Sequence, residues 1–189
     1  AQSLMARSYR QLFQAICPQE SLLLEVGLFR PDRYSPGLAN LLGVGMHYTD
    51  PFTELPPPYG PGTLNPDLRL QAWPDGKRGW LVGAAQHLTE PEVTERLLAP
   101  DFDPGQCVYL TDALPGPQEG QAGPVGAFQW EKYDCNDLAV MIDSPAACWF
   151  LLNDTLAPGW SAQVHGQAAP ILPADPAFRP VYLAPGRHP

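Results

Sequence analysis

The chain has 189 residues, of which 44% are apolar, and a formal net charge of −9 at pH 7. This length and apolar content suffice for a hydrophobic core, so disorder is not the expected state. The negative charge repels phosphate backbones and argues against nucleic acid as a partner. The 24 prolines and 17 glycines predict a folded, loop-rich protein with short elements.

Helical patterns lie in the N-terminal half of the chain. Apolar residues at helical spacing predict an amphipathic helix over residues 3–16. A serine followed by a proline suits the start of a second, shorter helix over residues 35–42. Thr89 and Glu92 form a capping-box pattern, which predicts a third helix over residues 91–99.

The stretch from residue 50 to residue 66 is rich in proline, which lacks the backbone donor that helices and central strands require. It predicts a long loop, serving either as a stiff surface connection or as a docking segment for a groove lined with aromatic residues. Short strands are predicted after it, over residues 69–73, 79–83 and 107–110.

The pattern changes near residue 125 to closely spaced strands separated by turn signals about every ten residues, which is typical of antiparallel sandwiches and jelly rolls. The predicted strands cover residues 127–133, 137–143, 147–153, 160–164, 168–172 and 178–183. The expected class is α+β, mainly β. A mixed α/β part spans residues 1–124, with a few short helices, and an antiparallel sandwich or jelly-roll-like part spans residues 125–189. One continuous domain is the alternative.

Several short motifs occur in a fixed order toward the C-terminus. They are the turn Pro158-Gly159-Trp160, the hairpin pair His165-Gly166, the pair Phe178-Arg179 and the turn Gly186-Arg187-His188. Upstream lie Leu41-Leu42-Gly43-Val44, Trp80-Leu81-Val82-Gly83 and Asp101-Phe102-Asp103-Pro104. This ordered set resembles the C-terminal extracytoplasmic domain of the YfhO family of bacterial membrane proteins. His165 departs from the aspartate usual in that family, although histidine tolerates positive φ better than most residues.

The resemblance implies a lobe on the extracytoplasmic face of the bacterial cytoplasmic membrane. Its expected partner is the transmembrane part of its own parent protein, a multi-helix region similar to glycosyltransferases that use lipid-linked sugars. In such proteins the catalytic carboxylate lies in that membrane region, so no catalytic residue and no cofactor are expected in this segment. A saccharide or lipid-linked sugar is the ligand class implied. The alternative is a purely structural or protein-interaction module.

Three residues are candidates for ligand binding: Trp160, Arg179 and Trp130. Each tryptophan either fills the core or offers a flat ring on which the apolar face of a pyranose stacks. Arg179 either forms an ion pair, with Asp154 or Asp175 as partner, or makes bidentate hydrogen bonds to a ligand.

No metal site is expected. The four cysteines, Cys17, Cys107, Cys135 and Cys148, lack the paired spacing of zinc sites, and they fit either two disulfides or isolated buried thiols. The acidic pairs Asp101 with Asp103 and Asp134 with Asp137 raise the alternatives of glycosidase carboxylates or calcium ligands, but adjacent loop acids are more typical of turns.

Overall fold

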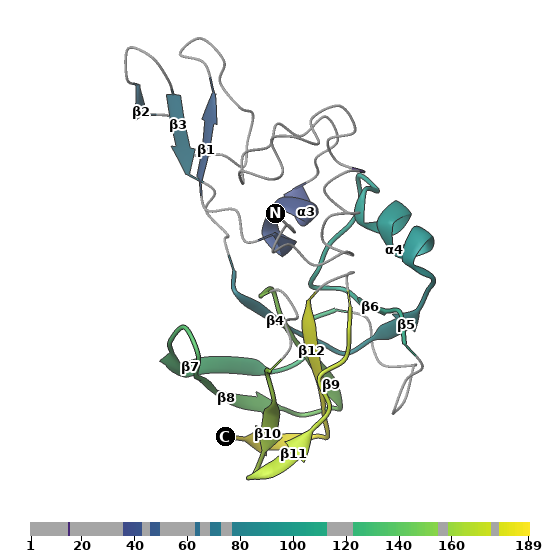
Figure 1. Cartoon of the computed structure of the whole chain (residues 1–189), viewed down its shortest axis with the longest axis vertical. Helices are drawn as coiled ribbons and strands as arrows, with labels where there is room; N and C mark the ends of the chain where they lie inside the picture. The colour runs from purple at the N-terminus through teal and green to yellow at the C-terminus, as the bar shows by residue number, and fades with distance from the viewer. Residues whose placement is uncertain are drawn as a thin grey trace.

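A computed structural model describes residues 15, 36–42, 46–49, 63–64, 69–72, 77–112, 123–154, 159–174 and 178–189. Most of the described elements are strands in small sheets (Figure 1). The described structure also contains the short helices α3 (Pro36–Leu41) and α4 (Glu90–Leu97). This confirms the predicted mainly β, α+β class. The helix predicted over residues 3–16, apart from residue 15, and most of the proline-rich stretch lie outside the described residues.

A three-stranded antiparallel sheet forms the centre of the described structure, with its strands in the order β12-β9-β4. These strands are β4 (Gly79–Val82), β9 (Cys148–Leu152) and β12 (Arg179–Leu183). Pro180 fits in β12 because a strand at a sheet edge does not need every backbone donor. Since β4 precedes residue 125 and pairs with β9, strands from both parts of the chain share this sheet.

Strand β9 separates two hydrophobic cores, because successive side chains of a strand point to opposite faces. Trp149 and Leu151 belong to the first core, and Cys148, Phe150 and Leu152 belong to the second. All five side chains are buried. A strand with both faces covered is a continuous apolar run, which is what the sequence shows at this position.

The first core lies between the central sheet and the helices. Helix α4 contributes Val93 and Leu97, and α3 contributes Leu38 and Leu41. A parallel strand pair, β5 (Ala85–His87) with β6 (Val108–Leu110), completes this layer. The predicted capping box of α4 is confirmed, because the Glu92 carboxylate accepts hydrogen bonds from the backbone N–H of Thr89 at 2.8 Å and from its hydroxyl at 2.6 Å.

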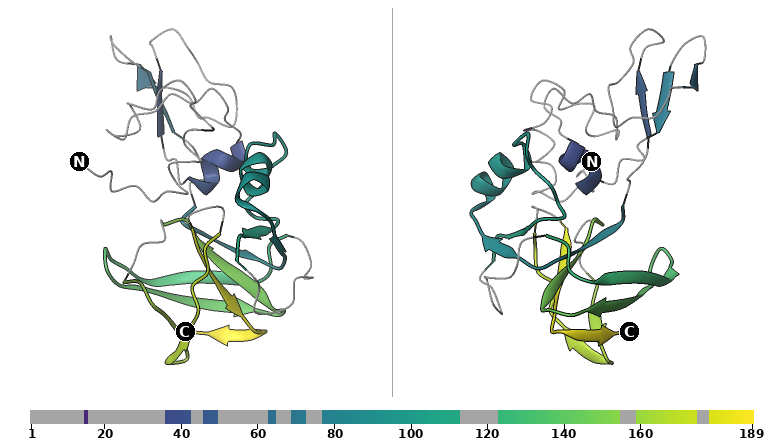
Figure 2. Two further views of the ribbon diagram at one scale, coloured as in Figure 1. Left: turned by 45° about the vertical axis from the view of Figure 1, so that its right-hand side comes forward. Right: turned by 180° about the vertical axis from the view of Figure 1, so that it is seen from behind.

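The second core is closed by another three-stranded antiparallel sheet, ordered β13-β8-β7. Its strands are β7 (Ala127–Tyr133), β8 (Leu138–Ser144) and β13 (Gly186–His188). Phe128, Trp130 and Ile142 of this sheet pack toward the central sheet. The two sheets pack face to face as a sandwich, which includes β4 from outside the C-terminal half for which a sandwich was predicted. The helices lie on the other side of the central sheet (Figure 2).

The hairpin of β10 (Ala162–Val164) and β11 (Gln167–Ala169) turns at His165 and Gly166. Both residues have positive φ, 52° and 75°, as a two-residue type I′ turn requires. The remaining sheet, β1-β3-β2, consists of β1 (Met46–Thr49), β2 (Thr63–Leu64) and β3 (Arg69–Ala72). Strands β3 and β4 belong to different sheets and therefore form no hairpin, although the residues between them, Pro74-Asp75-Gly76, have the composition of a turn.

Candidate functional site

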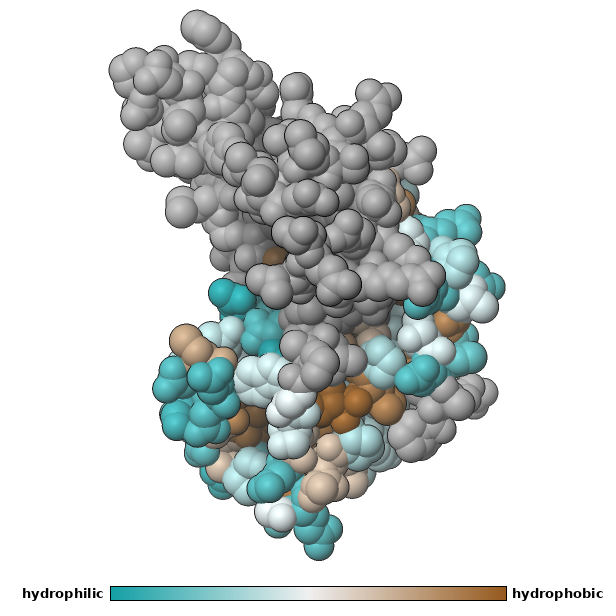
Figure 3. All heavy atoms as spheres, in the orientation of Figure 1, coloured by the Kyte–Doolittle hydropathy of each residue, from teal (hydrophilic) through white to brown (hydrophobic). Residues whose placement is uncertain are grey.

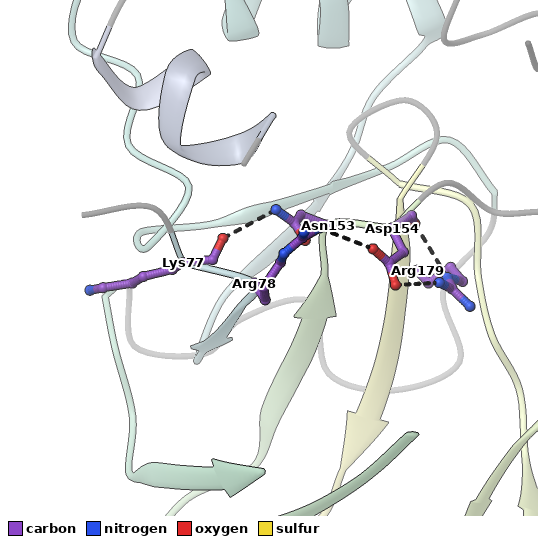
Figure 4. A network of polar contacts seen from close by, with 5 residues as sticks. All are labelled: Lys77, Arg78, Asn153, Asp154 and Arg179. Carbon is purple, nitrogen blue, oxygen red and sulfur yellow. Dashed lines mark hydrogen bonds and ion pairs between the residues drawn. The ribbon is translucent and has the colours of Figure 1, made fainter. Parts of the chain in front are cut away.

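Three charged residues meet at one end of the central sheet, and we call Arg78, Asp154 and Arg179 the arginine–aspartate cluster. The sheet register brings them together, because Leu152 of β9 lies opposite both Gly79 of β4 and Arg179 of β12. Arg78 directly precedes β4, and Asp154 lies two residues after Leu152. Figure 4 shows Asp154 between the two arginines.

Arg179 is the buried member of the cluster, with only 5% of its side chain exposed. Its Nη2 lies 2.9 Å from Oδ2 of Asp154, and its Nε donates to the backbone carbonyl of Asp154 at 3.3 Å. This confirms the ion pair with Asp154 predicted from the sequence, whereas Asp175 lies outside the described residues. Burial lowers the pKa of Arg179, and the charges of Asp154 and Tyr133 offset part of that effect.

Arg179 also places its guanidinium over the indole ring of Trp160, with Cζ 4.2 Å from the ring centroid. At this separation the positive charge is attracted to the ring face. Trp160 is partly exposed. Two of the three candidate residues, Trp160 and Arg179, therefore contact each other, and the partly exposed Asp154 pairs with the buried arginine.

Arg78 is the exposed member of the cluster. Its Nη1 lies 3.6 Å from Oδ1 of Asp154, and 56% of its side chain is exposed. Its Cζ also lies 5.9 Å from the centroid of the Tyr133 ring. Arg78 thus joins the cluster to a second aromatic residue, which sequence reasoning did not single out.

Tyr133 is 47% exposed and is the one large hydrophobic residue classed as exposed within the described part of the chain. The pairing of β7 with β8 shifts register between Trp130 and Lys132. A bulge of this kind adds one residue and moves the next side chain to the other face. The rings of Trp130 and Tyr133 consequently meet edge to face, with centroids 4.9 Å apart. A strict alternation pattern would place Trp130 and Tyr133 on opposite faces of β7, so it does not predict this contact.

Trp130, the third candidate, connects Tyr133 to the second core. Its ring also lies edge to face with Phe128, at 5.9 Å between centroids, and with Phe150, at 6.0 Å. The ring of Trp130 is partly buried against that core. The structure therefore places Trp130 next to the Tyr133 end of the site, and it does not bring Trp130 into ring contact with Trp160 among the described contacts.

Asn153 lies beside the cluster, and only 7% of this residue is exposed. Its backbone N–H donates to the carbonyl of Arg78 at 3.2 Å, and its Nδ2 donates to the carbonyl of Lys77 at 3.1 Å (Figure 4). Its Oδ1 is buried and has no hydrogen-bond partner in the described structure. The segment of Lys77 and Arg78 is thus fixed by two hydrogen bonds to Asn153, which lies 76 positions after Lys77.

The acidic pairs considered as catalytic or calcium-binding residues serve local turns instead. Asp103 accepts a hydrogen bond from the backbone N–H of Gly105 at 2.8 Å, and Asp101 pairs with Arg96 at 3.0 Å. Asp134 accepts from the backbone N–H of the next residue, and Asp137 pairs with Lys132. Over the described ranges, no group of three or more His, Cys, Asp and Glu residues is arranged to hold a metal ion.

The described cysteines differ in accessibility. Cys148 is fully buried, and burial raises the pKa of its thiol, an effect that its hydrogen bond with Ser144 partly opposes. Cys135 is an exposed free thiol. Cys148 matches the isolated buried thiols considered from the sequence, Cys135 does not because it is exposed, and Cys17 lies outside the described residues.

No family model, curated protein or solved structure matches this chain. Among the described helices, none has the length and apolar character that a membrane span requires.

Proposed function

We propose that this chain is a non-catalytic recognition lobe that binds a saccharide at Trp160 and the arginine–aspartate cluster. We further propose that it belongs to a YfhO-like membrane protein, lies on the extracytoplasmic face and contacts the transmembrane part of that protein. The order of the sequence motifs supports this origin. The observation that carries the binding proposal is the partly exposed Trp160 ring held against Arg179, which is itself paired with Asp154.

Saccharides need two kinds of contact, and the site offers both. The C–H groups on one face of a pyranose are apolar and stack on a flat indole, while its hydroxyls require hydrogen-bond partners. The Asp154 carboxylate has about four acceptor positions, of which the described contact of Arg179, at 2.9 Å, occupies one. The arginine donors and the remaining acceptor positions are suited to sugar hydroxyls.

The rigidity of the site favours binding. Arg179 is buried, and Asn153 fixes the backbone on the other side of the cluster. Groups that are already ordered lose little conformational entropy when a ligand binds. Figure 3 shows that the described surface in this view is mixed, with small hydrophobic areas scattered among hydrophilic residues. This mixture suits a polar ligand better than a broad apolar docking surface would.

Isothermal titration calorimetry with a panel of bacterial cell-envelope oligosaccharides tests the proposal. At least one should give saturable heat with the unchanged protein. Trp160→Ala should abolish that heat, whereas Trp160→Phe, which keeps a flat ring, should retain part of it. Calorimetry is preferable to tryptophan fluorescence because Trp160→Ala also removes a reporter.

Gln86→Ala, at an exposed position of β5, is the matched control and should bind as the unchanged protein does. Circular dichroism must show that each variant is folded. If no oligosaccharide binds, or if Trp160→Ala binds unchanged, the recognition proposal is wrong, and a structural module docked on its membrane partner takes its place.

A further inference from the structure

We infer that the saccharide recognised at this site carries a negatively charged group, and that Arg78 is the residue that pairs with it. This inference rests on the proposed function and names the ligand class of the same site. In the arginine–aspartate cluster two guanidinium groups share one carboxylate, so positive charge is in excess there.

The cluster has a formal charge of +1, and the exposed Lys77 precedes it directly in the chain. The chain as a whole carries −9. A local positive charge on an acidic protein attracts an anionic ligand to one place, while the remaining surface repels it. The charge distribution therefore favours an acidic saccharide over a neutral one at this site.

The two arginines have different roles. Arg179 is buried, its Nε and Nη2 contact Asp154, and the face of its guanidinium lies over the ring of Trp160. Arg78 is mostly exposed, and its contact with Asp154, at 3.6 Å, is longer than a hydrogen bond. A guanidinium has five donors in a planar fork that matches a carboxylate or phosphate. Arg78 is thus the arginine placed to donate to a ligand, and Arg179 is a positioning residue for Trp160.

Further observations agree with an added anion. Burial lowers the pKa of Arg179, so the charge of Asp154 does not fully compensate the loss of water around the guanidinium. A second negative charge near the cluster would add to that compensation. Asn153 keeps the backbone of Lys77 and Arg78 in place through two hydrogen bonds, so the backbone that carries the positive side chains is preformed.

The inference is tested with a matched pair of ligands, tetragalacturonate and its fully methyl-esterified form, which share one sugar backbone and differ at the carboxyl groups, charged in the acid and neutral in the ester. Calorimetry at low ionic strength should give about tenfold tighter binding of the acid, the size expected of one charge-assisted contact. The preference should weaken as salt is added, because ions screen exposed charges. Glucose 1-phosphate against glucose repeats the comparison with phosphate as the anionic group, so the two arms show which anion is favoured.

Arg78→Gln should remove the preference for the acid while the ester binds as before. Arg187→Gln, which removes an exposed arginine of β13, is the matched control and should keep the preference. Trp160→Ala should weaken the binding of both forms, because stacking does not depend on the charge of the ligand.

The outcomes separate this inference from the proposed function. Equal binding of acid and ester, or a preference that survives in Arg78→Gln, overturns the inference and leaves a saccharide lobe. Binding of inorganic phosphate as tightly as the sugar phosphate also overturns it, because the site would then recognise an anion without the sugar. If no saccharide binds, whether charged or neutral, the proposed function itself is wrong.

Discussion

Strand β9 and the residues that follow it are organised in different ways. Within β9 all five side chains are buried and apolar, and they alternate between two cores. Directly after it, Asn153 and Asp154 contact Lys77, Arg78 and Arg179 through polar groups. The burial of β9 follows from its own residue types, so it depends on a local stretch of sequence. The polar contacts after β9 depend instead on segments that are far apart in the chain.

This contrast has consequences for energy and for function. A side chain that fills a core stabilises the fold in proportion to its buried surface. A charged side chain near the surface contributes little unless it is buried with a partner, and its removal then leaves the partner uncompensated. Substitutions can therefore measure whether β9 and the cluster behave as differently as their contacts suggest.

The largest effect is expected for Trp149→Ala. Trp149 is 1% exposed and packs edge to face with Tyr182, with ring centroids 5.2 Å apart. Truncation leaves a large cavity and should lower the free energy of unfolding by about 3–5 kcal/mol. Urea denaturation followed by circular dichroism measures this value. Trp160→Ala should cost about 1 kcal/mol or less, and a similar loss in both variants would contradict the contrast.

Asp154→Ala should have an intermediate effect. It leaves the buried guanidinium of Arg179 without its carboxylate partner, which should lower the free energy of unfolding by about 2–3 kcal/mol. Asp137→Ala is the matched control, because it removes the carboxylate of an exposed pair with Lys132 and should cost less than about 1 kcal/mol. Urea denaturation of both variants measures the difference. Equal losses would show that burial of Arg179 adds nothing to the ion pair.

These contacts also show how much could be predicted from the sequence. The helix capped by Thr89 and Glu92, the turn at His165 and the strands of the C-terminal half other than β13 were predicted, because apolar alternation and turn chemistry are local signals. The expectation of a turn at residues 186–188 was wrong, because these residues pair with β8 as strand β13. The fold class follows from those elements. The pair of Arg179 with Asp154 was one of two pairings considered, since both residues lie in the same region of the chain.

Other features depended on pairing that no local pattern contains. The sequence did not indicate that β4 joins β9, and the position of Arg78 beside Asp154 follows from that register. The parallel strand β5 is only three residues long, too short for a periodic signal. Tyr133 was missed because the bulge in β7 reverses the face expected from alternation. The predicted site therefore lacked Arg78 and Tyr133, whose positions depend on the pairing and register of strands.

The smallest effect is expected for a contact that is entirely local, the capping box of α4. The hydrogen bonds from the Thr89 hydroxyl and backbone N–H lower the pKa of Glu92 below its ordinary value of 4.5. A carboxyl group with a lowered pKa stabilises the fold above its ordinary pKa, and this contribution is lost as the pH falls through the lowered value. Glu92→Gln keeps an acceptor but removes the charge, so it isolates that contribution.

The thermal midpoint of Glu92→Gln should therefore lie slightly below that of the unchanged protein at pH 7, and the gap should close as the pH falls below about 4.5. Thermal denaturation between pH 7 and pH 3 measures the gap. In a Thr89→Ala background the same substitution should have less effect at pH 7, because the principal partners of the carboxylate include the lost hydroxyl. A gap that persists at pH 3 would assign the effect to helix packing. If the gap closes as expected, the charge of Glu92 in the capping box contributes less to stability than the pair of Arg179 with Asp154. The capping box can be predicted from four consecutive residues, whereas the pair at Arg179 is brought together only by the sheet register.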